Sequence, residues 1–162
     1  MRNRRILDLL CLSSISLSGC YTHAILHPVS GPPISEGYRA VIKPSGAFNS
    51  GPFYADLQEG RWFSNGECKG RWKAASPPKP LVANDMASLW DMVYGDGYYT
   101  TRILGAKQCA RGSGICKKQG TVLDAEICQL EDGQNRKPTR VGVARDKDSV
   151  YKISFCLLDP CY

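Results

Sequence analysis

The chain has 162 residues, of which 43% are hydrophobic and 22% are charged. This length allows one domain with a single core and excludes two ordinary domains. The formal net charge is +6 at pH 7, but the Lys and Arg residues are scattered along the chain. This distribution argues against nucleic acid as a partner. It favours a solvated surface that meets other anionic molecules.

The chain begins with the pattern of an export signal. Three arginines lie within residues 1–5, and a weakly apolar run follows over residues 6–18. A helix needs roughly 20 apolar residues to cross a bilayer, so this run is too short for a permanent membrane span.

The apolar run ends in Leu17-Ser18-Gly19-Cys20, which resembles the lipobox of bacterial lipoproteins. A lipobox consists of an aliphatic residue, a small residue, Gly or Ala, and then the cysteine that is acylated. The resemblance implies diacylglyceryl transfer to the Cys20 thiol, cleavage between Gly19 and Cys20, and acylation of the new α-amine, for example with palmitate. Several acyl chains anchor a protein stably, whereas one chain binds only marginally. The alternative is a buried N-terminal helix that happens to end in Gly-Cys.

A lipoprotein of this kind would act in the cell envelope. Tyr21 is not the Asp that retains many lipoproteins in the inner membrane, so in an envelope with two membranes it favours the outer membrane, with the domain facing the periplasm. Removal of residues 1–19 takes away three Arg and one Asp, which lowers the net charge from +6 to +4. The expected partners are the membrane, through the lipid anchor, and an envelope protein, peptidoglycan or lipopolysaccharide.

We predict that residues 20–37 form an extended tether. The stretch contains three prolines and no usable hydrophobic period, which is typical of a linker. Both histidines of the chain, His23 and His27, fall within it, and Pro28 argues against a helix that would bring them together as a metal pair. A single β-rich domain is then expected over residues 38–162.

Alternating hydrophobic residues predict strands in the first half of this domain. The expected strands cover residues 38–43, 52–57, 61–64 and 67–73. Asn65-Gly66 is the predicted hairpin turn, because both residues tolerate positive φ. The pattern Ala55-x-Leu57 followed by Asn65-Gly66-x-Cys68-x-Gly70-x-Trp72 resembles small β-rich bacterial lipoproteins, and the resemblance implies a fold class rather than an activity.

One helix is predicted, over residues 85–94. Its apolar residues share one helical face: Met86, Leu89, Trp90 and Val93. Asn84 or Asp85 can cap its N-terminus, and Gly95 can end it. A helix this short is not stable alone, so we expect its apolar face to pack on the sheet.

The second half has the pattern of an antiparallel meander. We predict strands over residues 98–107, 121–130, 140–145 and 150–157, with a Gly- and Cys-rich turn between the first two. In the last strand one face is expected in the core: Tyr151, Ile153, Phe155 and Leu157. The whole domain is therefore predicted to be mainly β, a small antiparallel barrel or sandwich of about seven or eight short strands with one short helix.

The chain has eight cysteines, of which Cys11 leaves with the signal and Cys20 carries the lipid. The remaining six are Cys68, Cys109, Cys116, Cys128, Cys156 and Cys161. An even number in an oxidising compartment favours up to three disulfides. Short loops with turn residues favour pairing Cys109 with Cys116 and Cys156 with Cys161, which leaves Cys68 with Cys128. A zinc site is disfavoured because the chain has no C-x-x-C pair, and free buried cysteines become the main alternative if the compartment is not oxidising.

Few patterns in the domain indicate catalysis, and none indicates a metal or a cofactor. A Ser-His-Asp or Cys-His site needs a histidine, and both histidines lie in the predicted tether. A carboxylate pair for glycoside cleavage has many candidates and no distinguished pair among Glu59, Glu67, Asp91, Asp96, Asp124 and Glu126.

Aromatic residues near basic ones are the remaining candidates for a binding face. Trp62, Tyr98, Tyr99 and Arg111 would suit contacts with a sugar or a peptide, although core packing explains the aromatics equally well. We therefore predict a non-enzymatic, membrane-anchored lipoprotein that binds an envelope component or a partner protein. The alternatives are an inhibitor of a cell-wall hydrolase and a carboxylate-based cell-wall hydrolase.

Cys20→Ala tests the predicted anchor. Without the thiol there is no atom to receive the diacylglyceryl group, so the variant should leave the membrane fraction, and mass spectrometry of the native protein should find an acylated N-terminal Cys20. Persistence of residues 1–19 in the native protein, or membrane retention of the variant, would contradict the lipoprotein prediction.

Overall fold

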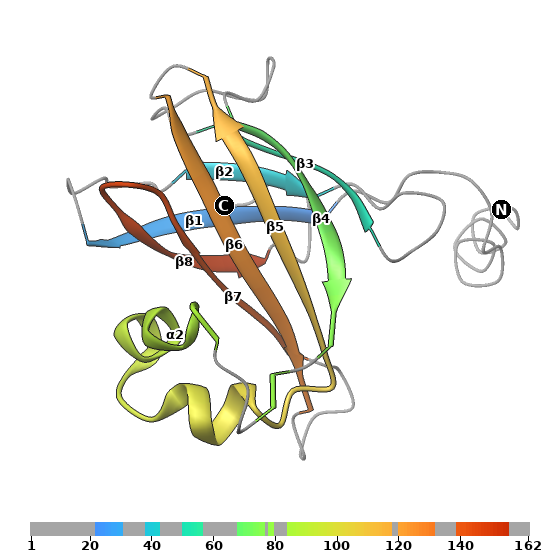
Figure 1. Ribbon diagram of the computed structural model, residues 1–162, viewed down its shortest axis with the longest axis vertical. Helices are drawn as coiled ribbons and strands as arrows, with labels where there is room; N and C mark the ends of the chain where they lie inside the picture. The colour runs from blue at the N-terminus through green and yellow to red at the C-terminus, as the bar shows by residue number, and fades with distance from the viewer. Residues whose placement is uncertain are drawn as a thin grey trace, which may run out of the picture.

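The structure is a computed structural model that describes residues 22–30, 38–42, 50–56, 68–76, 78–79, 84–117, 120–131 and 139–155. Within these residues, eight antiparallel strands each pair with their neighbours in sequence, and β1 also pairs with β8, so the sheet closes into a barrel (Figure 1). The mainly β prediction is confirmed, and the architecture is the barrel. The strands are β1 (Thr22–Ser30), β2 (Tyr38–Ile42), β3 (Ser50–Asp56), β4 (Cys68–Ala75), β5 (Gln108–Cys116), β6 (Thr121–Leu130), β7 (Thr139–Arg145) and β8 (Val150–Phe155).

The predicted tether is wrong over residues 22–30, because they form β1 and close the barrel. Ala24 and Leu26 are buried in the interior, whereas His27 is exposed, so the strand alternates as a barrel strand should. Pro28, which argued for a linker, lies where the pairing register with β8 shifts. Proline lacks an N–H and is tolerated at such irregularities.

The strands of the first half agree with prediction where the structure describes them. β2 and β3 lie at the predicted places, and β4 covers most of the predicted return strand. The partner of β4 is however β3, with Ala55 opposite Cys68. The predicted strand 61–64, the Asn65-Gly66 turn and Leu57 lie outside the described residues.

The predicted helix is confirmed as α2 (Ala87–Tyr94). The Asn84 side-chain oxygen accepts a hydrogen bond from the Met86 N–H at 2.9 Å, which satisfies one of the free donors at the helix start. Gly95 ends the helix with φ 106°, a backbone conformation that favours glycine.

The strand predicted over residues 98–107 is wrong. Tyr99–Ile103 forms a short π-helical segment, η1, and β5 begins only at Gln108. β5 then runs straight through the stretch predicted as a Gly- and Cys-rich turn. Its glycines are there for a different reason: Gly112 and Gly114 lie beneath the Phe53 ring and leave room for it. The turn comes later, where Gly120 has φ 63°.

The barrel interior forms one hydrophobic core, and a second core lies outside the barrel wall. Inside, Phe53, Leu123, Tyr151 and Ile153 pack together with the Cys68–Cys116 disulfide. Outside, α2 and η1 cover the outward faces of β5, β6 and β7, and Figure 1 shows α2 beside β7. The buried residues of this second core include Met86, Leu89, Trp90, Tyr99, Ile103, Leu130 and Val143. The prediction that the helix packs on the sheet is therefore confirmed.

The described cysteines form two disulfides, and their pairing corrects the predicted one. Cys68 is bonded to Cys116 and Cys109 to Cys128, and in each case the two residues lie directly opposite on neighbouring strands. The predicted Cys109–Cys116 bond is excluded because both cysteines lie on the single strand β5, about 23 Å apart at roughly 3.3 Å per residue. The predicted Cys68–Cys128 bond is wrong as well, because Cys68 is bonded to Cys116 and Cys128 to Cys109. Cys156 and Cys161 lie outside the described residues.

Gly70→Ala is expected to destabilise the barrel. A Cβ at this position would overlap the Ser113 carbonyl oxygen and come within 2.5 Å of the Phe53 ring. Overpacking of this kind costs about 1–3 kcal/mol, measurable by urea denaturation. The matched control is Gly105→Ala, where nothing lies within 4 Å of the added Cβ and the change should stay within about 0.5 kcal/mol. Equal stabilities of the two variants would contradict the close packing of Phe53 on the glycines.

Candidate functional site

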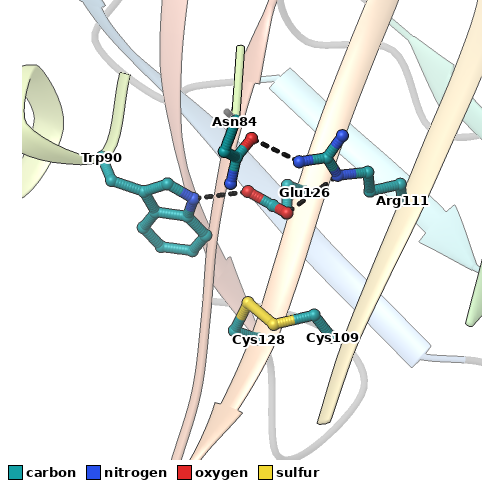
Figure 2. The surroundings of a disulfide bond; sticks show 6 residues. All are labelled: Asn84, Trp90, Cys109, Arg111, Glu126 and Cys128. Atoms are coloured by element: carbon teal, nitrogen blue, oxygen red, sulfur yellow. Dashed lines mark hydrogen bonds and ion pairs between the residues drawn. A yellow bond between two sulfur atoms is a disulfide. The ribbon is translucent and has the colours of Figure 1, made fainter. Parts of the chain in front are cut away.

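A buried carboxylate lies between the barrel wall and the helix. Glu126 on β6 is 1% exposed, the only charged side chain buried among the described residues. Its Oε2 accepts a hydrogen bond from Trp90 Nε1 at 2.7 Å, and its Oε1 accepts one from Arg111 Nε at 2.9 Å (Figure 2). A buried carboxylate is tolerated only when it is paired in this way. Glu126 therefore joins α2 to β5 and β6.

Arg111 links this carboxylate to the start of the helix. One guanidinium nitrogen donates to the Asn84 side-chain oxygen, and another lies 3.3 Å from Asp85 Oδ1. The second oxygen of Asp85 pairs with Arg145 at 3.2 Å. Burial opposes the charged guanidinium, but the hydrogen bond and charge of Glu126, with the charge of Asp85, outweigh it and raise the Arg111 pKa. Arg111 lies on β5, and its side chain is engaged within the fold.

The described residues of the predicted binding face, Tyr98, Tyr99 and Arg111, are engaged within the fold. Tyr99 is only 8% exposed and belongs to the core beneath the helix. Tyr98 is partly buried and stacks on Tyr94, with ring centroids 4.6 Å apart. Trp62 lies outside the described residues. Since Arg111 also points into the Glu126 network, these residues do not share one exposed surface.

Tyr94 completes the contact between α2 and the last strands. Its hydroxyl donates to the Gly142 carbonyl at 3.1 Å, and the Lys152 ammonium lies 5.1 Å from the centre of its ring. Burial is the main reason that the pKa of Tyr94 is raised to about 12. The hydroxyl is thus neutral at physiological pH and serves as a packing and hydrogen-bonding group.

The histidines and carboxylates considered above also have defined places. His23 and His27 lie on β1. Partial desolvation of the His27 imidazole, followed by the charge of Lys152, lowers the pKa of His27. Asp91 accepts a hydrogen bond from the Tyr99 N–H at 2.8 Å, which ties α2 to η1. Among the described residues, no three His, Cys, Asp or Glu side chains gather in a group that could hold a metal ion. Glu59 and Glu67 lie outside those residues.

The barrel interior contains an apolar cavity of about 220 Å³. All eight strands contribute to its wall, and most of the contributing side chains are hydrophobic. Small residues create the space: Ala24, Ala40, Ala55, Ala110, Gly112 and Ala125. Larger apolar side chains and two arginines complete the lining: Leu26, Phe53, Trp72, Leu123, Ile127, Ile153, Phe155, Arg111 and Arg140. The volume exceeds that of an engineered cavity of about 150 Å³ that binds benzene.

A second pocket, which we call the outer groove, has a volume of about 480 Å³ and lies on the outer surface beside the start of α2. It is lined by Ser50, Arg71, Trp72, Lys73, Asp85, Met86, Arg111, Gly112, Ser113, Asp124 and Ala125. Its walls carry charges of both signs, and Arg111 and Asp85, which meet there, already pair with each other. The interior cavity is therefore the better candidate for a specific site.

Comparison with known protein families, with curated proteins and with solved structures finds no match to this chain. In the described part of the chain, no helix combines the length and the apolar character that a membrane crossing requires.

Arg111→Met is expected to destabilise the protein strongly. It leaves the Glu126 carboxylate buried without its cationic partner. Because the Arg111 side chain is 40% exposed, we expect a cost below the roughly 3–5 kcal/mol of a fully buried pair. The double variant Arg111→Met with Glu126→Leu removes both charges and should recover part of the loss, because apolar replacement of a buried pair is often neutral but the buried Trp90 Nε1–H then lacks its acceptor. Urea denaturation of the two variants measures both effects.

The control for this pair is Lys107→Ala. Lys107 pairs with Glu131 at 3.4 Å on the surface, where both side chains are mostly exposed, so its loss should cost less than about 1 kcal/mol. A loss for Arg111→Met no larger than for Lys107→Ala would contradict the assigned role of the buried pair.

Proposed function

We propose that this protein is a non-enzymatic, lipid-anchored envelope lipoprotein whose barrel binds the apolar part of an envelope component in its interior cavity. The observation that carries the proposal is the cavity of about 220 Å³, to which every strand contributes and whose lining is mainly hydrophobic. Concave, largely apolar and preformed cavities are the usual form of small-molecule sites.

The unfilled space inside the barrel supports a binding role. Protein interiors are normally packed as densely as organic crystals. Here five alanines and one glycine leave a cavity of about 220 Å³ that larger side chains at those positions would occupy. We infer that small residues hold these positions so that the space can take a ligand.

The position of the barrel relative to the proposed anchor supports a ligand from the membrane. β1 begins at Thr22, two residues after Cys20. If Cys20 is acylated, the barrel lies directly at the bilayer surface rather than at the end of a long tether. Acyl chains are then the apolar groups nearest to the cavity.

Ala110→Leu tests the proposed binding site. Ala110 lines the cavity from β5, and a larger side chain there should fill part of the space. We expect the affinity for a neutral apolar probe, N-phenyl-1-naphthylamine, to fall about tenfold or more in a fluorescence titration, with no loss of stability because the void becomes smaller.

The matched control is Ala75→Leu, on the opposite face of the paired strands β4 and β5. Ala75 lines neither the interior cavity nor the outer groove, so this variant should bind the probe as the native protein does. Unchanged probe binding by Ala110→Leu, or no probe binding by the native protein, would contradict the proposed binding site in the cavity.

A further inference from the structure

The cavity has one cationic side chain that is not engaged elsewhere in the described structure. Arg140 lies two residues before Gly142 on β7. A Cβ added at Gly142 would lie 3.0 Å from the Ile153 side chain, so position 142 faces the inside of the barrel. Because side chains alternate along a strand, Arg140 also occupies an inward position, and it lines the cavity. Its side chain is exposed, which places it at the mouth rather than in the depth of the barrel.

Arg140 differs in this respect from the other arginines near the helix. Arg111 and Arg145 are held by carboxylates, Glu126 and Asp85. Within the described residues, no hydrogen bond or ion pair engages the Arg140 guanidinium. A guanidinium of this kind presents a planar set of donors that matches a carboxylate or a phosphate.

Arg140 also lies at a particular end of the barrel. It is near the start of β7, and β7 is antiparallel to β8, so this end contains Phe155 at the end of β8. Phe155 pairs with Ala24, near the start of β1. The start of β1 follows the proposed lipidated Cys20, so the mouth with Arg140 is the end of the barrel nearest to the anchor.

We propose that the ligand is an anionic single-chain amphiphile, with its acyl chain in the apolar cavity and its carboxylate or phosphate head on Arg140. This inference rests on the proposed function and adds the head group, the orientation and the residue that selects it. The chain is directed into the barrel, and the head stays at the mouth, where the membrane surface supplies such molecules.

The experiment compares decanoate with decanol, which share a chain and differ in the charge of the head. Isothermal titration calorimetry with the native protein should show decanoate binding about tenfold more tightly than decanol, because a charge-assisted hydrogen bond is stronger than a neutral one. Arg140→Gln should weaken decanoate about tenfold and leave decanol unchanged, whereas Arg140→Lys should retain part of the preference.

The matched control is Arg102→Gln. Arg102 is an exposed arginine on η1 that lines neither the interior cavity nor the outer groove, so this variant should bind decanoate and decanol as the native protein does. Decyl phosphate should compete with decanoate, and inorganic phosphate alone should not, because the chain is needed for binding. Competition by inorganic phosphate at similar concentrations would overturn the amphiphile and indicate a site for a free anion.

The other outcomes separate this inference from the proposed function. Equal binding of decanol and decanoate by the native protein would overturn the role of Arg140 and leave the apolar site standing. A loss of both ligands in Arg140→Gln would assign Arg140 a structural role only. Binding of neither ligand by the native protein would overturn the cavity as a site, and the inference with it.

Discussion

The buried carboxylate of Glu126 is the interaction on which the arrangement of helix and barrel depends. Removal of a carboxylate from water costs several kcal/mol unless strong partners replace the lost hydration. Figure 2 shows the Trp90 indole and the Arg111 guanidinium on opposite sides of this carboxylate. One partner belongs to the helix and the other to β5, so the carboxylate is satisfied only when α2, β5 and β6 are all in place. The pair thus selects one packing of the helix on the barrel.

β5 is the strand where the two cores meet. Its inward residues include Cys116, bonded to Cys68 in the barrel interior, and its outward residues include Cys109, bonded to Cys128 beneath the helix. The two disulfides therefore hold β5 to both neighbouring strands, one on each face of the sheet. Both disulfides therefore join strands that contribute to the cavity.

One large ring and a set of small residues shape the barrel interior. Phe53 fills the interior over the glycines of β4 and β5, and small residues leave the remaining space open. The open space extends to the barrel end that contains Arg140 and Phe155, near the start of β1. If Cys20 is acylated as proposed, this end of the barrel faces the bilayer, and the apolar cavity is suited to an acyl chain from it.

The sequence by itself determined the elements whose signals are local. The spacing of Met86, Leu89 and Trp90 predicts α2, and alternation predicts most of the β2, β3, β6, β7 and β8 strands. Local signals also misled. Prolines in residues 20–37 concealed β1, and the glycines of β5 indicated a turn where they make room for Phe53. In both cases the conformation depends on partners far away in the sequence.

Only the tertiary structure decided the disulfide pairing, the buried network and the cavity. Cys109 meets Cys128 because the register of β5 on β6 places them opposite each other, and that register is a property of the paired strands. The same register brings Arg111 to Glu126, a pair that no spacing in the chain indicates. The cavity depends on which alanines face inward together from different strands. Arg140 becomes a candidate for ligand recognition only because barrel closure places it at the mouth of that apolar space.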